Sequence, residues 1–192
     1  MTIYRAQGFV DGGYIRGCAP EAEEPGESIW PRPAELIRFA ANTEHVDSWL
    51  RATQYPRVGG IHVQRTTYYD GRPDDDKDLD PRLREYWEAI ELEPDTQLGF
   101  GMVRGKKRIR QKAVDTLLVT DLLVGVFTDL FEIAILLAGD QDFVPAVIEA
   151  KRRGVMVVVM AEERSLGDDL RRAADRVLLF TASTLFPEHR FK

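Results

Sequence analysis

The chain has 192 residues, of which 44% are hydrophobic and 30% charged, and its formal net charge is −6. This composition is typical of a soluble globular protein, and the absence of a run of ~20 apolar residues excludes a membrane span. A single cysteine, Cys18, excludes an internal disulfide, and no signal peptide is recognisable, so we expect a cytoplasmic protein without membrane contact.

The first half of the sequence alternates apolar segments with segments rich in glycine, proline and charge. A strand is predicted over residues 6–11, where the apolar run ends at Asp11, and two glycines indicate a turn after it. Further elements are predicted as follows: one or two helices over 34–54, a strand over 60–70, a helix over 81–92 and a strand over 96–105. The segment 70–80, which holds six aspartates, is expected to be a solvated loop.

From residue 114 onward the pattern is more regular. Helices are predicted over 114–129, 143–154 and 165–175, and strands over 132–138, 155–160 and 176–180. The strands show little polar alternation, so both of their faces should be buried. Apolar strands that alternate with helices indicate βαβ units, and the fold class predicted is α/β with a mainly parallel sheet flanked by helices.

Aspartates follow two of the predicted strands at the ends where α/β proteins bind ligands. Asp11 ends the first strand, and Asp140 and Asp142 follow the strand at 132–138. If these strands are neighbours, the three carboxylates meet at one edge of the sheet. Asp115 is expected to begin the helix that leads into the same strand, where it could also serve only as a helix cap.

Clustered carboxylates without histidine or cysteine favour a hard cation with oxygen ligands, Mg²⁺ or Mn²⁺. None of the three histidines lies in these segments, so zinc is not expected. A cation of this kind most often serves phosphate chemistry, because it polarises a phosphoryl oxygen and activates water. The alternative is that each aspartate only caps a helix or forms a turn.

Three motifs in this order resemble the NYN domain of the LabA-like (DUF88) group, which belongs to the PIN-like nuclease superfamily. They are "FVDGGY", "QKAVDTLLVTDLL" and "LLAGDQDFVPAV" followed by "RRGVMVVV". The resemblance covers residues 5–16 and about 98–180. It implies a Rossmann-like (PIN-like) three-layer α/β/α fold, a pocket for Mg²⁺ or Mn²⁺, and metal-assisted endonuclease cleavage of RNA.

The resemblance also implies which residues form the pocket. The set carried over is Asp11, Asp115, Asp140 and Asp142. Asp121 also matches a family position, but six residues along a regular helix correspond to about 240° of rotation, so it should point away from Asp115. Where many members have an asparagine, this chain has Tyr14, which could stack on an RNA base or pack against the sheet.

A basic run from Arg104 to Lys112 precedes Asp115. RNA needs cationic groups to neutralise its phosphates beside an acidic site, and the residues expected to contact its backbone are Lys106, Lys107, Arg108 and Arg110. Lys112 matches the family motif and could pair with a pocket carboxylate. The alternative is a solvated turn that carries charge.

The chain is expected to be one domain, 1–192, in which residues of about 17–95 elaborate the family pattern. The leading hypothesis is a metal-dependent ribonuclease. The runner-up is a weak or inactive module of the same fold that binds RNA or a protein partner, and self-association stays open. A different Mg²⁺-dependent phosphotransferase fits less well, and a dinucleotide enzyme is disfavoured because "DGGYIRG" lacks the glycine pattern of that class.

Overall fold

A computed structural model describes residues 2–18, 30, 33–42, 58–73, 79–101 and 107–181. The strands are β1 (Thr2–Asp11), β2 (Val58–Gly71), β3 (Thr96–Gly101), β4 (Ile133–Leu137), β5 (Met156–Glu162) and β6 (Arg176–Phe180). The helices are α1 (Gly12–Cys18), α2 (Pro33–Asn42), α4 (Pro81–Glu91), α5 (Lys107–Phe127), α6 (Val144–Arg152) and α7 (Asp168–Ala173), with a 3-10 turn η2 (Gln141–Phe143). The predicted alternation of strands and helices is confirmed.

The six strands form one parallel sheet with the order β3-β2-β1-β4-β5-β6. β2 and β3 therefore lie on one side of β1, and β4, β5 and β6 lie on its other side. The strand order reverses between β1 and β4, where Val10 lies opposite Leu137. In open parallel sheets, ligands bind beyond the carboxyl ends of the strands at such a reversal.

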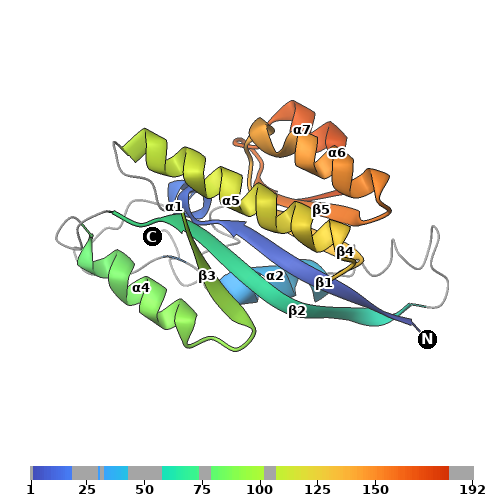
Figure 1. Cartoon of the computed structure of the whole chain (residues 1–192), viewed down its shortest axis with the longest axis horizontal. Coiled ribbons are helices and arrows are strands. Elements are labelled where there is room, and N and C mark those ends of the chain that lie inside the picture. Colours follow the sequence, from blue (N-terminus) through green and yellow to red (C-terminus); the bar gives the residue numbers. More distant parts are fainter. Residues whose placement is uncertain are drawn as a thin grey trace.

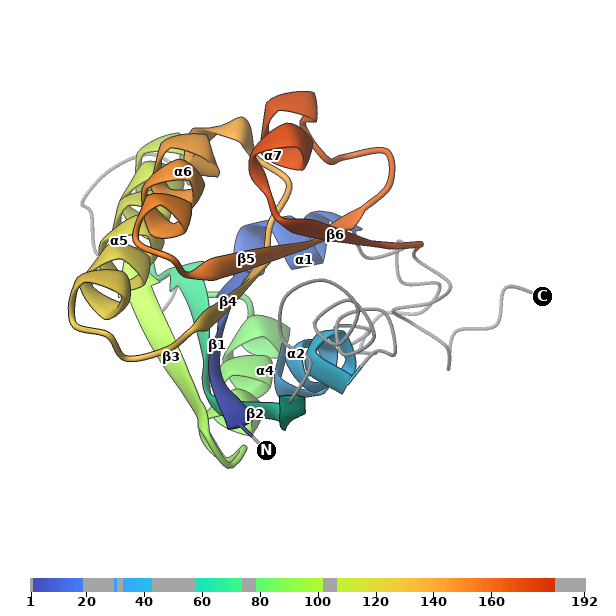
Figure 2. The ribbon, with the colours of Figure 1, turned by 90° about the vertical axis from the view of Figure 1, so that its right-hand side faces the viewer.

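Helices cover both faces of the sheet, which gives three layers (Figures 1 and 2). One core cluster joins the sheet to Ile37 of α2 and Trp87 of α4, and the other joins it to Leu118 of α5, Val147 of α6 and Leu170 of α7. Every residue of β4 is buried, as its unbroken apolar sequence predicts for a strand covered on both faces. The predicted three-layer α/β/α fold is confirmed.

Two details differ from the sequence-based expectations. Helix α5 begins at Lys107, so Asp115 lies two turns inside the helix and does not cap it. Asp70 is not part of a solvated loop, because β2 continues to Gly71 and the side chain of Asp70 is only 3% exposed.

Residues 17–95 contribute α2, β2 and α4, and β2 pairs directly with the central strand β1. β2 therefore belongs to the middle of the sheet, and α2 and α4 pack on one of its faces. The second part of the predicted helical region, 43–54, lies outside the described residues. In the described part of the chain, no helix has the combination of length and hydropathy that a bilayer crossing requires.

Helix α5 approaches the sheet closely beside Asp115, and a glycine permits this approach. A Cβ atom added to Gly101 of β3 would lie 2.7 Å from the backbone nitrogen of Val114. Backbone atoms of a packed helix cannot give way as the end of a side chain can. The absence of a side chain at Gly101 therefore allows α5 to pack this close to the end of the sheet.

We predict that Gly101→Ala lowers the free energy of unfolding by about 1–3 kcal/mol, because the added methyl group overpacks this junction. The control is Gly17→Ala in α1, where an added Cβ meets nothing within 4 Å. That change should stabilise the protein by about 0.5–1 kcal/mol through the lower backbone entropy of the unfolded chain. Urea unfolding of both variants measures the difference, and equal effects would contradict the proposed contact.

Candidate acidic active site

Asp11 ends the central strand at the point where the strand order reverses. Its side chain is buried, and one of its oxygens accepts a hydrogen bond of 3.0 Å from the backbone N–H of Tyr14 in α1. Burial raises the pKa of Asp11 to about 6, the negative charge of Asp70 acts in the same direction, and the Tyr14 N–H and Arg16 oppose the shift. A buried carboxylate that loses its proton this close to neutrality is typical of a functional site.

Asp115 reaches the same edge of the sheet from α5. Burial raises its pKa to about 6, and the negative charges of Asp11, Asp140 and Asp142 add to the shift. These three carboxylates are therefore near enough to Asp115 to repel its charge. The sequence-predicted set of four aspartates is brought to one edge of the sheet by three separate segments: β1, α5 and the turn after β4.

Asp140 and Asp142 lie in the turn between β4 and α6, and both are exposed. A side-chain oxygen of Asp140 accepts a hydrogen bond of 3.0 Å from the backbone N–H of Asp142, so Asp140 caps the η2 turn. The capping role considered from the sequence is thus real for Asp140. It uses one carboxylate oxygen and leaves the other free to face the rest of the site.

The donor set is the kind that Mg²⁺ or Mn²⁺ prefers, because all four side chains offer carboxylate oxygens. No described cationic side chain forms an ion pair with Asp115, Asp140 or Asp142, so their repulsion is not relieved within the described part of the chain. As the side chains stand, no three acidic, histidine or cysteine side chains among the described residues are close enough to hold one ion. The fit to a divalent cation therefore rests on the chemistry of the donors.

Asp121 lies on the same helix but does not join this group. Its carboxylate accepts a hydrogen bond of 3.0 Å from the hydroxyl of Tyr69 in β2. It is not among the charges that shift the pKa of Asp115. The rotation along α5 separates the two side chains, as the helical geometry predicts.

The predicted RNA-contact residues lie at the beginning of α5 or before it. Lys106 lies outside the described residues, and Lys107, Arg108, Arg110 and Lys112 belong to the first turns of the helix. A solvated turn is therefore the wrong description from Lys107 onward. The side chains of these four residues are outside the described part of the structure, so their contact with RNA stays a prediction.

Tyr14 joins the first motif to the loop that follows β5. Its hydroxyl lies 2.6 Å from Oγ of Ser165 and accepts a hydrogen bond of 2.8 Å from the backbone N–H of Glu162. A Cβ added to Gly139 would lie 2.5 Å from the Tyr14 ring, so the ring packs directly against the turn that carries Asp140. The alternative considered from the sequence was packing against the sheet, and Tyr14 packs against both core clusters that contain the strands. Base stacking by Tyr14 stays a prediction.

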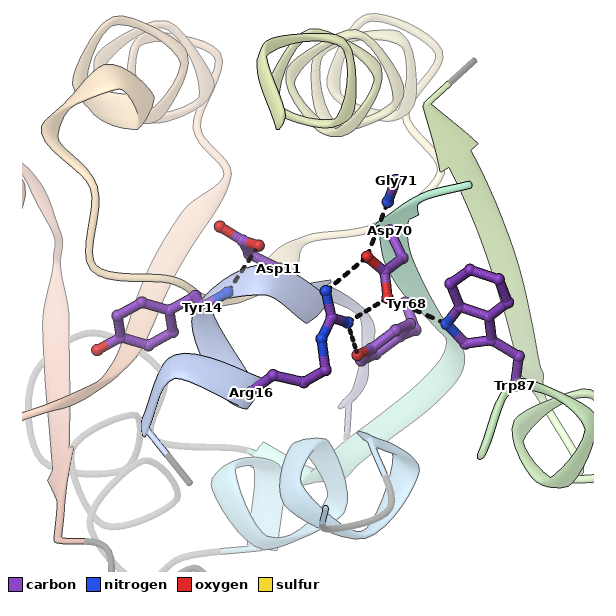
Figure 3. A network of polar contacts seen from close by, with 7 residues as sticks. All are labelled: Asp11, Tyr14, Arg16, Tyr68, Asp70, Gly71 and Trp87. Atoms are coloured by element: carbon purple, nitrogen blue, oxygen red, sulfur yellow. Dashed lines mark hydrogen bonds and ion pairs between the residues drawn. The ribbon is translucent and has the colours of Figure 1, made fainter. Parts of the chain in front are cut away.

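A buried ion pair between Arg16 and Asp70 lies beside Asp11 (Figure 3). Arg16 also donates a hydrogen bond of 2.9 Å to the hydroxyl of Tyr68. Asp70 accepts further hydrogen bonds from Nε1 of Trp87 at 3.0 Å and from the backbone N–H of Gly71 at 2.7 Å. With donors on both of its oxygens, Asp70 is neutralised within the protein, which distinguishes it from the four aspartates of the site.

Sequence reasoning missed this pair. Its members are 54 residues apart, and Asp70 was grouped with the acidic segment that follows it. The available signal was that "TTYYD" ends a strand with an aspartate, as "FVD" does at Asp11.

We predict that Asp115→Asn stabilises the metal-free protein at neutral pH and not at acid pH. Burial and like charges raise the pKa of Asp115 from its ordinary value of 3.8 to about 6 in the folded state, so its charge costs stability that is absent below about pH 4 and fully present above about pH 6. With allowance for solvent screening, the gain at neutral pH should be about 1 kcal/mol. Urea unfolding of the wild type and of Asp115→Asn in EDTA at both pH values measures it, and an equal gain at the two pH values would contradict the prediction.

We predict that Arg16→Met lowers the free energy of unfolding by about 3–5 kcal/mol, because it leaves the charge of Asp70 buried without its partner. Arg16→Met/Asp70→Asn should recover part of this loss, since no charge stays buried and the single asparagine oxygen can still accept from either Trp87 or Gly71. Thermal or urea unfolding of the single and double variants measures the coupling. Equal stability of Arg16→Met and Arg16→Met/Asp70→Asn would show that the buried charge of Asp70 does not depend on Arg16 for its stabilisation.

Comparison with known proteins supplies the family. No curated protein matches the chain. A solved structure of a protein of unknown function from Vibrio parahaemolyticus RIMD 2210633 is similar at 16% sequence identity, with a TM-score of 0.48 over 92% of this chain and 93% of that one. The family model of the NYN domain matches residues 30–181, most of the sequence, including Asp115, Asp140 and Asp142. The chain therefore belongs to the NYN domain family.

Proposed function

We propose that the protein is a metal-dependent endoribonuclease that hydrolyses RNA phosphodiester bonds with Mg²⁺ or Mn²⁺ held by Asp11, Asp115, Asp140 and Asp142. The NYN domain is a PIN-like nuclease family, which supports nuclease chemistry in general. The observation that carries the proposal is the convergence of four carboxylates at the reversal of strand order, where their mutual repulsion helps to raise the pKa of Asp115.

Repulsion of this kind lowers the stability of the folded chain, and aspartates with only a structural role do not require it. Four like charges at one edge destabilise the folded chain unless a cation neutralises them or protons are taken up. Asp70, close by, shows how the same protein neutralises a carboxylate when its role is structural: an arginine is paired with it. The four site aspartates lack such an arginine among the described residues, which supports a divalent cation as their partner.

The chain's own residues would position the ion and the RNA. Asp11 is held by the Tyr14 N–H on a buried strand end, and Asp140 is held by its cap to Asp142, so both have fixed backbones. The exposed side chain of Asp142 can rotate to complete the coordination, and Asp140 can contribute the carboxylate oxygen that its cap does not use. A bound divalent cation would supply a polarised phosphoryl oxygen and an activated water.

The basic first turns of α5 lead directly to Asp115, and we propose that Lys106, Lys107, Arg108, Arg110 and Lys112 contact RNA phosphates there. Such contacts hold the strand at the acidic edge without reading its sequence. Membership of the LabA-like group, a cytoplasmic location, and a homo-oligomer or protein partner stay predictions from the sequence.

The proposal is tested by cleavage of a labelled single-stranded RNA in Mn²⁺, Mg²⁺ or EDTA. We predict that Asp140→Asn/Asp142→Asn lowers the cleavage rate by a factor on the order of 10²–10³. The lost charge stabilisation raises the activation free energy by several kcal/mol. The rate of the wild type should rise with pH through about 6, because Asp11 and Asp115 must lose their protons before they bind a cation.

The control is Asp95→Asn/Asp129→Asn, which makes the same change of charge at two exposed positions away from the site. Both residues have a positive φ, which asparagine tolerates as well as aspartate does. Its cleavage rate should equal that of the wild type. RNA that is bound but never cleaved, in any of the metals, would assign the protein to the alternative, a binding module of the same fold.

A further inference from the structure

Residues of α6, α7 and the η2 turn line an open groove of about 870 Å³. Figure 1 shows α6 and α7 on the same side of the sheet as α5. The volume of the groove is within the range of sites that hold small molecules or parts of a polymer. The residues that line it are Gln141, Val144, Pro145, Ile148, Lys151, Arg152, Asp169, Arg172 and Ala173. None of these has a part in the function proposed above.

The groove begins at the η2 turn, next to two of the site aspartates. Gln141, which lines it, stands between Asp140 and Asp142 in the η2 turn. The turn is held against the start of α7 by a hydrogen bond of 3.0 Å from the N–H of Gly167 to the carbonyl of Gly139. Both helices therefore start at the edge where the carboxylates gather, and the groove runs away from that edge between them.

The wall on α6 is apolar and accessible. Val144, Pro145 and Ile148 line the groove, and Ile148 is 41% exposed although it is a large aliphatic residue. Exposed apolar side chains inside a concave surface offer contact area to a flat apolar group such as a nucleobase. Single-stranded RNA presents such groups, whereas a duplex keeps its bases stacked inside.

The end of the groove away from the acidic site is cationic. Arg152 lies eight residues after Val144 on α6, about 12 Å along the helix axis. Arg152 and Arg172 are 73% and 69% exposed, and among the described residues each pairs only with a carboxylate on its own helix, Glu149 and Asp169 respectively. Exposed pairs of this kind contribute little to stability, so both guanidinium groups are available to a phosphate.

Lys151 is held differently, because its Nζ donates to the carbonyl of Ala173 at 2.6 Å and lies 3.1 Å from a carboxylate oxygen of Asp175. It ties α6 to the end of α7 and keeps this end of the groove in shape. The groove lining holds three cations and one carboxylate, and the carboxylates that pair with Lys151 and Arg152, Asp175 and Glu149, do not line it. The residues that face the groove therefore present more positive than negative groups to a polyanion.

We propose that the groove between α6 and α7 binds the single-stranded RNA segment next to the bond that is cleaved. Bases of this segment contact Val144, Pro145 and Ile148, and its phosphates contact Arg152 and Arg172. The assignment rests on the proposed nuclease function, because continuity with the acidic site is what selects RNA over other polyanions. It adds a second RNA surface to the one expected at the start of α5.

The test compares two double variants of equal charge. Arg152→Ala/Arg172→Ala removes the two arginines that line the groove. Arg153→Ala/Arg171→Ala removes their sequence neighbours, which do not line it, and Arg153 also pairs with Glu149. Binding of a fluorescein-labelled single-stranded RNA is measured by anisotropy in EDTA at several salt concentrations, and circular dichroism confirms that each variant is folded.

The groove variant should bind more weakly than the wild type, with a salt dependence that is less steep by about 1.4, because each lost phosphate contact on a single strand contributes about 0.7. The control variant should keep the wild-type slope. Ile148→Ala should raise the Kd about fivefold through lost apolar contact, and Val124→Ala, at a 53% exposed position on α5, should not. In cleavage assays the groove variants should raise KM and leave kcat unchanged.

The outcomes separate this proposal from the proposed nuclease activity. If the wild type cleaves RNA and the two double variants have equal KM and salt slopes, the groove assignment is overturned and the nuclease stands. If the wild type binds RNA without cleaving it and only the groove variant binds weakly, the groove is the RNA surface of a binding module and the nuclease fails. If the wild type does not bind RNA at all, the groove assignment is overturned as well.

Discussion

The reversal of strand order between β1 and β4 is the constraint on which the rest of the molecule depends. Because all six strands are parallel, their carboxyl ends meet at one edge, and the two strands at the reversal send their following segments to opposite faces of the sheet. The chain after β1 continues into α1, and the chain after β4 continues through η2 into α6. The space between these two exits is where Asp11 and Asp140 stand, and α5 brings Asp115 to it.

Electrostatics divides the carboxylates of this edge into two kinds. Asp70 is buried and neutralised by Arg16, Trp87 and the backbone, so it stabilises the end of β2 and the position of α1. Asp11 and Asp115 have their pKa raised to about 6 by burial and by like charges, so the folded chain holds them at a cost. Proteins commonly retain such a cost at functional sites and offset it in the surrounding core. Here the surrounding core is the sheet, which is packed on both faces.

The periodicity of the sequence predicted the fold well, and it did so for a physical reason. Strands such as β4 are buried on both faces and therefore carry continuous apolar runs, which local reading detects. The beginning of α5 was missed because "KRIRQK" has no apolar stripe. Lysine, arginine and glutamine are nevertheless good helix formers, so the helix extends back through them to Lys107.

The site was predictable only in part. Asp11, Asp140 and Asp142 could be placed because they follow strands, and Asp115 and Asp121 through the resemblance to the family. The partners of Tyr14 and Arg16 could not be predicted, since Ser165 and Asp70 are 151 and 54 residues away in the chain. Such contacts are set by tertiary packing, and local sequence patterns carry no information about which distant residues will pair.

The central claim is that the four aspartates form one cation site, and Mn²⁺ binding coupled to proton release tests it most directly. Carboxylates that are partly protonated near pH 6 must give up protons when a cation binds. Calorimetric titration with Mn²⁺ at this pH, in buffers of different ionisation enthalpy, measures the affinity for Mn²⁺ and the number of protons released. Our account predicts that the wild type binds Mn²⁺ with release of protons, and that Asp140→Asn/Asp142→Asn loses both. Binding of equal strength by the two proteins, or binding without proton release, would contradict it.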